Sequence, residues 1–325
     1  MKNRISISLV ALAACSTLAA QQGSLAGPVT GFVYDAPARA VRPIQGIPGA
    51  ALIGDPVSFG LDVHGAYVSP HQDAAFVSAA DGSLHFFRLT SAGPVETGIG
   101  GVNFVPQGVV FSPSGSAAAL FAAGRVQVFR GLPNAPALAA SMTLPASGGM
   151  QAAPAGRARS NGTAIPAFAI SDDGQYLITA GGQLLSVNGD AHSVAAAGAG
   201  TMVAFAPGGH DVALLDPANG LTVIRDASGA GTLQKVAPAD DTLTSSAGLA
   251  FSQDGAKLFV ASASTQSVIS FDLAAGTRAT IACNCTPTTL APMGSLFRIT
   301  ELTGDPLWLV DAVASRTVFV PAKTN

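Results

Sequence analysis

Charged side chains are scarce in this chain of 325 residues, since Asp, Glu, Lys and Arg make up only 11% of it. The 16 Lys and Arg residues against 19 Asp and Glu give a net charge of −3, which leaves no basic surface for nucleic acid. A coiled coil is excluded because it needs abundant Glu, Lys and Arg at heptad spacing. Intrinsic disorder is excluded because it needs low hydrophobicity, and 48% of this chain is hydrophobic.

Groups that carry catalysis or bind metals are scarce too. No two of the five His residues have the i, i+2 or i, i+4 spacing of a metal-ligand pair, and the only Glu residues are Glu96 and Glu301. The adjacent acidic pairs at 172–173 and 240–241 supply too few oxygen atoms for calcium. No Gly-x-Ser-x-Gly elbow leads into a helix. The sequence therefore indicates no catalytic, cofactor-binding or metal-binding residue, and we expect no cofactor.

The first residues are typical of an export signal. A basic start at residues 1–4 precedes an apolar stretch at 5–14, which is shorter than the roughly 20 residues that span a bilayer. Residues 12–15 (Leu-Ala-Ala-Cys) resemble the bacterial lipobox, whose cysteine is lipidated, whereas ordinary cleavage would follow Ala20. We expect residues 1–24 to be the signal and the protein to be periplasmic, displayed on the cell surface or secreted. It would contact a membrane only through a lipid on Cys15.

The chain has three cysteines, Cys15, Cys283 and Cys285. Removal or lipidation of Cys15 leaves an even pair, as expected in an oxidising compartment. Cys283 and Cys285 could form a local disulfide, remain free thiols or act as a redox or metal pair. A metal site needs four ligands, and the sequence offers no second Cys pair to complete one. This absence favours a disulfide between Cys283 and Cys285.

One pattern recurs along the chain: an apolar strand, a Ser or Ala, a turn rich in Pro, Asp and Gly, and a second apolar strand. The Ser-like positions of its copies are Ser69, Ser112, Ser171, Ala206, Ser252 and Thr300. Their spacing approaches the period of about 40–50 residues of a four-stranded propeller blade. A third and a looser fourth strand follow most copies, for example at 268–271 and 277–281. Asp-Gly and Ser-Gly supply the positive φ of the tight turns.

These repeats predict an all-β fold, a single β-propeller over residues 25–325 with six or seven four-stranded blades. The last blade ends after its third strand, at 317–320. We expect its missing strand to come from the N-terminal strands at 31–35 and 40–44, so that strands from both chain ends close the ring. Alternatively, residues 31–63 form a degenerate seventh blade.

The Ser-x-Asp-Gly cores at 171–174 and 252–255 resemble those of secreted bacterial β-propellers related to the YVTN and WD40 repeats. The resemblance covers residues 31–325. Residues 259–262 (Phe-Val-Ala-Ser) approximate the tetrad that names the YVTN group, and the Gly-His and Trp-Asp signatures of WD40 blades are absent, so no subfamily is assignable. The resemblance implies a rigid ring whose faces are lined by loops.

The longest interval between repeats contains an insertion at about 132–166, rich in Pro, Gly and Ala. Its composition predicts a long surface loop, and long loops on rigid scaffolds often carry function.

Two functions fit the chain. The first is a non-catalytic exported scaffold of the cell envelope that binds an unknown protein or small-molecule partner on a propeller face. The alternative is a lactonase-like hydrolase, because YVTN-like propellers include lactone-hydrolysing enzymes with His, Arg and Glu at the channel mouth. Two Glu residues provide little material for that acid–base chemistry.

Overall fold

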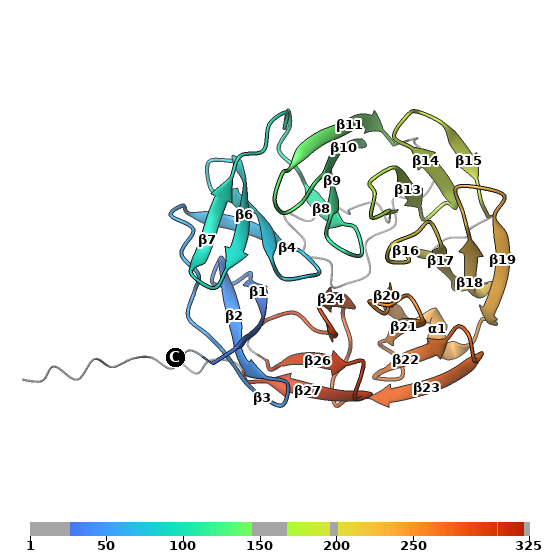
Figure 1. Ribbon diagram of the computed structural model, residues 1–325. Helices are drawn as coiled ribbons and strands as arrows, with labels where there is room; N and C mark the ends of the chain where they lie inside the picture. The colour runs from blue at the N-terminus through green and yellow to red at the C-terminus, as the bar shows by residue number, and fades with distance from the viewer. Residues whose placement is uncertain (1–26, 145–167, 196–200, 304, 322–325) are drawn as a thin grey trace, which may run out of the picture.

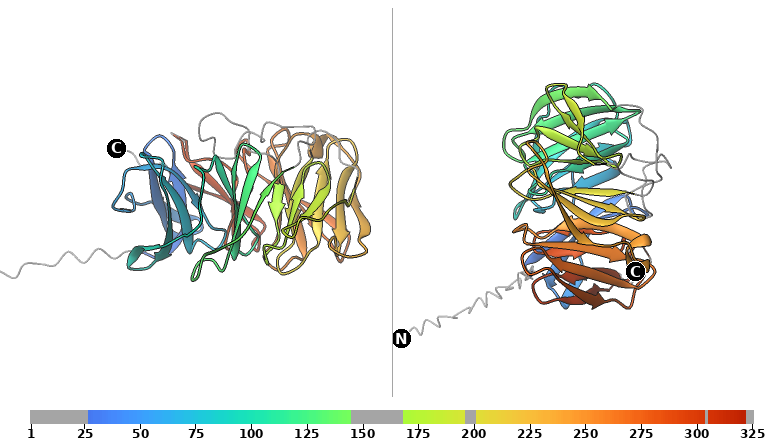
Figure 2. Two further views of the ribbon diagram at one scale, coloured as in Figure 1. Left: turned by 90° about the horizontal axis from the view of Figure 1, so that it is seen from above. Right: turned by 90° about the vertical axis from the view of Figure 1, so that its right-hand side faces the viewer.

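The computed structural model describes residues 27–144, 168–195, 201–303 and 305–321 as seven antiparallel sheets arranged in a ring (Figure 1). Figure 2 shows the ring from its edge, as a disc whose strands run between two faces. Each sheet is one blade, so the predicted all-β propeller is confirmed. Among the described residues the only helix is α1 (Asp241–Thr244), and no helix has the length and hydrophobicity to cross a membrane.

The blades follow one another along the chain, and six of them contain four strands. Blades 1 to 4 comprise, in order, β1 (Val29–Asp35), β2 (Ala40–Ile47) and β3 (Ala50–Ile53); β4 (Val63–Val68), β5 (Ala74–Ala79), β6 (Leu84–Thr90) and β7 (Gly93–Thr97); β8 (Gly108–Phe111), β9 (Ala117–Ala122), β10 (Arg125–Arg130) and β11 (Ala137–Thr143); β12 (Phe168–Ile170), β13 (Tyr176–Thr179), β14 (Gln183–Ser186) and β15 (Ala191–Ser193). Blades 5 to 7 comprise β16 (Met202–Phe205), β17 (Val212–Asp216), β18 (Gly220–Arg225) and β19 (Thr232–Ala237); β20 (Ser246–Phe251), β21 (Lys257–Ser262), β22 (Ser267–Asp272) and β23 (Thr277–Ala282); β24 (Ala291–Met293), β25 (Leu296–Arg298), β26 (Leu307–Asp311) and β27 (Arg316–Val320).

The recurring Ser has a local structural role in the turn between the first two strands of a blade. Ser112 is fully buried, and its hydroxyl oxygen accepts a hydrogen bond of 3.1 Å from the backbone N–H of Ala117. Ser171 accepts the equivalent bond, 3.0 Å long, from Tyr176. Gly174 adopts a φ of 62° in this turn, which a glycine does without strain. We call the side of the ring that carries these turns the turn face.

The core consists of seven hydrophobic clusters, each between two neighbouring blades. The second strands are the most deeply buried, and every residue of β17 is buried. The outer strands are exposed, as the pattern of β15 shows. Each sheet therefore buries its apolar faces only because a neighbour stands on either side, which is the physical reason for the ring.

Blade 1 has three strands among the described residues, and β1 takes the place of a second strand. In four other blades, the N–H at the end of the third strand donates to the carbonyl of the residue just before the second strand. These bonds run from Leu89 to Asp73, Leu132 to Ser116, Val187 to Gln175 and Leu273 to Ala256. In blade 1 the matching bond, 2.8 Å long, runs from Gly46 to Pro28, just before β1. The strand that blade 1 lacks is therefore its innermost one.

The ring closes where the two ends of the chain meet, because blade 1 packs on blade 7 through one hydrophobic cluster. Asp35 and Leu302 also form an isolated parallel bridge. The expected sharing of strands within the last blade is wrong, since blade 7 holds four strands of its own. Its first strand, β24, is short and contains Pro292, which conceals it in the sequence. The alternative, that the N-terminal region forms a seventh blade, is confirmed.

The expected loop at 132–166 is wrong in its first part, since β11 lies there and pairs with β10 as the outer strand of blade 3. An outer strand is exposed and needs no apolar run, so its Ala- and Ser-rich sequence gives no strand signal. Residues 145–166 of the predicted insertion, and residues 1–24 of the predicted signal, lie outside the described residues.

Candidate functional site

Two cavities lie along the axis of the ring. The smaller, about 170 Å³, is lined at the turn face by residues such as Pro113, Pro207 and Gln253. The larger, about 270 Å³, is lined by β1, β4 and β24 and so occupies the position where an inner strand of blade 1 would stand. Its walls are mainly apolar, with Tyr67 and Met293 among the lining side chains. A mainly apolar hollow with few polar groups is the usual form of a binding site.

The charged groups of the larger cavity are Arg298, the last residue of β25, and Glu301, which form an ion pair through Nη1 and Oε2. Their side chains are 19% and 30% exposed. The other carboxylate oxygen of Glu301, Oε1, is buried and has no hydrogen-bond partner among the described residues. A buried acceptor without a partner costs free energy, and a donor group of a ligand that reached this oxygen would recover it.

The tyrosines of the larger cavity donate hydrogen bonds to backbone carbonyl groups. Tyr34 donates from its hydroxyl to the carbonyl of His64 at 2.7 Å, and burial raises its pKa, with Tyr67 and Asp35 adding to the rise and Arg39 opposing it. Tyr67 donates to the carbonyl of Gln107 at 3.2 Å. Because its pKa is raised, the Tyr34 hydroxyl stays protonated at neutral pH and cannot serve as a general base.

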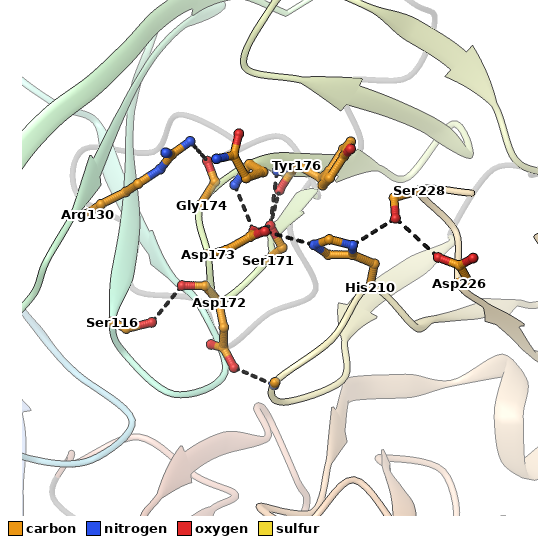
Figure 3. A network of polar contacts seen from close by, with 12 residues as sticks. Ser116, Arg130, Ser171, Asp172, Asp173, Gly174, Tyr176, His210, Asp226 and Ser228 are labelled. Carbon is orange, nitrogen blue, oxygen red and sulfur yellow. Dashed lines mark hydrogen bonds and ion pairs between the residues drawn. The ribbon is translucent and has the colours of Figure 1, made fainter.

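Polar side chains on the turn face tie neighbouring blades together (Figure 3). One carboxylate oxygen of Asp172 accepts from the N–H and the hydroxyl of Ser114 in blade 3, at 2.7 and 2.6 Å. The other accepts from the N–H of Gly208 in blade 5, at 2.8 Å. The backbone carbonyl of Asp172 accepts from the Ser116 hydroxyl at 2.6 Å. Asp172 in blade 4 thus joins the turns of three consecutive blades.

Asp173, His210 and Ser228 form a second chain of contacts between blades 4 and 5 (Figure 3). Asp173 Oδ2 lies 2.9 Å from His210 Nε2, and His210 Nδ1 lies 2.7 Å from the Ser228 hydroxyl. Burial alone would raise the pKa of Asp173, but hydrogen bonds from Ser171, Gln175 and His210 outweigh it and lower that pKa.

The order Asp, His, Ser invites comparison with a hydrolytic triad. The Ser228 hydroxyl, however, lies between His210 Nδ1 at 2.7 Å and a carboxylate oxygen of Asp226 at 3.2 Å, and Asp173, His210 and Ser228 do not line either cavity. A hydrolytic triad needs a space for the substrate beside the nucleophile as well as a hydroxyl proton directed at the base. The three residues therefore act as an inter-blade contact.

The residues singled out in the sequence do not gather at one site. Cys283 and Cys285 are disulfide-bonded in the connection from β23 to β24, and Cys15 lies outside the described residues. Glu96 pairs with His85 at 2.7 Å on the exposed outer part of blade 2, whereas Glu301 faces the larger cavity. In the described part of the chain, no three His, Cys, Asp or Glu side chains cluster closely enough to hold a metal ion.

The acidic pair at 240–241 has a helix-capping role. Asp240 accepts at 3.0 Å from the backbone N–H groups of both Thr242 and Leu243 and so caps α1. It also pairs with Arg278 at 2.6 Å. Among the remaining histidines, His71 Nε2 lies 3.5 Å from the side-chain nitrogen of Gln253.

Sequence reasoning missed Arg298 and the space beside it. The only feature of the sequence that could have indicated the ion pair is the position of Glu301 three residues after Arg298. Outside a helix, this spacing does not predict that two side chains meet. The absence of an inner strand before β1 could not be seen either, because the first Ser-like position recognised was Ser69.

No family model and no curated protein matches this chain. Among solved structures, a protein of unknown function from Desulfotomaculum acetoxidans is 14% identical, with a TM-score of 0.57 over 89% of this chain and 95% of its own. A proposed 6-phosphogluconolactonase from Bacteroides fragilis is 14% identical, with a TM-score of 0.56 over 91% and 94%. A second one, from Bacteroides uniformis, is 13% identical, with a TM-score of 0.56 over 90% and 95%. These similarities show a shared propeller fold.

Proposed function

We propose that this protein is a non-catalytic β-propeller of the cell envelope that binds a partner in its central channel. The observation that carries the proposal is the larger cavity, whose walls are mainly apolar and hold one Arg–Glu ion pair. Such a surface provides burial energy and one oriented polar contact, which is what a binding site requires.

Asp240 and Asp254, which line neither cavity, are unsuited to acid–base chemistry. A general acid near neutral pH needs a raised carboxyl pKa. The pKa of Asp240 is lowered instead, because hydrogen bonds from Thr242 and Arg278 outweigh the effect of burial. The pKa of Asp254 is lowered by the hydroxyl of Ser252. Both carboxylates are therefore firmly ionised and occupied in turns.

Affinity capture from the envelope fraction tests the binding role. Ala291 lines only the larger cavity and Ala169 lines only the smaller one, and both lie on short inner strands. The variant Ala291→Trp would fill the larger cavity, and Ala169→Trp is its matched control. We expect the wild type and the control to capture the same partner and Ala291→Trp to lose it. Equal capture by all three proteins would refute a role for this cavity.

A lactone hydrolase is the second candidate, favoured by the ion pair in the larger cavity and by the names of two neighbours of the same fold. Hydrolysis of 6-phosphogluconolactone and of unphosphorylated lactones by the purified protein decides between the two. Turnover that falls about 100-fold or more in Glu301→Gln, as expected for loss of an acid–base group, would establish the enzyme. No turnover above the spontaneous rate would leave the binding role in place.

Export with a lipid on Cys15 or cleavage after Ala20 is part of the same proposal. It is supported by the basic start and the apolar stretch at 5–14 and by the disulfide between Cys283 and Cys285.

A further inference from the structure

The inner edge of β1 carries main-chain groups that no strand of the described chain pairs. The backbone N–H of Phe32 donates to the side-chain oxygen of Gln72 in blade 2, at 2.7 Å. The main chain of Phe32 therefore faces away from β2, and that of Tyr34, two residues later, faces the same way. Both residues line the larger cavity. The cavity thus has the inner edge of β1 along one side. One N–H group of this edge, that of Phe32, already donates a hydrogen bond to the side-chain amide of Gln72.

The cavity lies at the position of an inner strand. It lies between β4 and β24, the inner strands of the two flanking blades. The inner strands of the other six blades have three to six residues. Every other inner strand pairs antiparallel with the second strand of its blade. A segment of similar length, antiparallel to β1, would complete blade 1.

The end of the cavity beside Asp35 indicates which part of a polypeptide would bind in it. The bridge between Asp35 and Leu302 places Leu302 beside the end of β1, where a segment antiparallel to β1 would begin. Glu301 is next to Leu302. Its carboxylate oxygen Oε1 is buried and has no hydrogen-bond partner among the described residues. An α-ammonium group at the start of the segment would donate to this oxygen. Capture of a free amino terminus is a known mode of peptide recognition.

We propose that the larger cavity binds the extended amino-terminal segment of a second polypeptide, which adds to β1 as the inner strand of blade 1 with its α-ammonium group on Glu301. The inference rests on the proposed binding function and names its ligand class. The first described residues of this chain do not enter the cavity. Gly27 lies against Gly46 of β2, and the carbonyl of Pro28 accepts a hydrogen bond from the N–H of Gly46. Apolar walls such as Val68 and Met293 favour small or apolar side chains in the ligand.

A fluorescent peptide tests the proposal by anisotropy. The probe is Gly-Val-Val-Phe, the sequence of β8, followed by Gly-Gly-Lys with fluorescein on the lysine, titrated against the exported protein. We expect saturable binding that weakens about tenfold when the amino terminus is acetylated, because a hydrogen bond to a charged group is lost. Glu301→Gln should bind the free and acetylated peptides equally. N-methylation of the second residue, which blocks strand pairing, should also weaken binding.

Matched variants and a shortened chain complete the experiment. Ala291→Trp should lose the peptide, and Ala169→Trp should keep it, with circular dichroism confirming that both fold. Equal binding of the free and acetylated peptides to the wild type, or binding retained by Ala291→Trp, would overturn the proposal. Binding seen only when the chain begins at Gly27 would also overturn it, because the ligand would then be this chain's own preceding residues. Loss of partner capture in Ala291→Trp without any peptide binding would refute this inference and leave the proposed function standing.

Discussion

Replacing Asp172 with Ala removes the acceptor of three hydrogen bonds that join three blades on the turn face. The N–H groups of Ser114 and Gly208 both lose a charged partner, although Ser114 is partly exposed and Gly208 is exposed, so that water can replace this partner in part. A hydrogen bond to a charged group contributes about 1.5–3 kcal/mol and less where water competes. We therefore expect Asp172→Ala to lower the free energy of unfolding by about 2–3 kcal/mol.

Asp172→Asn removes the charge of the side chain but keeps its shape. An amide oxygen can still accept from Ser114, but the amide nitrogen cannot accept from Gly208, so about half of the loss, roughly 1–2 kcal/mol, is expected. The matched control is Asp190→Ala in the same blade. Asp190 is exposed in the β14–β15 turn, its side chain makes no hydrogen bond to the described residues, and its loss should cost below about 0.5 kcal/mol.

Urea titration of the purified protein, followed by circular dichroism and by the fluorescence of its only tryptophan, Trp308, measures these differences. The order of midpoints should be wild type and Asp190→Ala highest, then Asp172→Asn, then Asp172→Ala, with similar slopes. If Asp172→Ala unfolds at the same urea concentration as Asp190→Ala, the contacts on the turn face do not stabilise the ring, and the reasoning is refuted.

Three further predictions concern other parts of the chain. The pKa of Asp173 is lowered in the fold, so its charge stabilises the protein above the unfolded value of about 3.9 and that contribution disappears as pH falls through the lower folded value. Between pH 7 and pH 2 the urea midpoint of Asp173→Asn should therefore decline less steeply than that of the wild type, and parallel curves would contradict this. Ser112→Ala should cost about 1–2 kcal/mol in urea titrations, because the N–H of Ala117 loses a buried acceptor, and an unchanged midpoint would show that the Ser is dispensable. Mass spectrometry of the exported protein should find a lipidated Cys15 or a free Gln21 as the first residue, and a retained Met1 would contradict processing.

The repeated hairpins could be predicted because their causes are local. Ser171, the turn after it and the N–H of Tyr176 lie within a few residues, so the sequence shows the whole unit. The outer strand β11 and the short strand β24 could not be predicted in the same way. The first is exposed and needs no apolar pattern, and the second contains a proline, so neither resembles an inner or second strand.

Most of the candidate site could not be predicted from the sequence. Glu301 could be named as one of two Glu residues, but neither its pairing with Arg298 nor its position in the larger cavity follows from spacing. The same holds for Asp172, whose partners Ser114 and Gly208 belong to other blades. Each of these contacts joins repeats, and the repeat pattern describes only what happens within one.

Composition, turn residues and the period of the repeat determined by themselves that this chain forms β-sheets of about four strands that must stack side by side, because each sheet is apolar on both faces. Only the tertiary structure decided the number of blades, the closure of blade 1 on blade 7 and the position of the channel cavities. These features depend on where the first and last sheets meet, and residues from opposite ends of the chain come together there without any local signal.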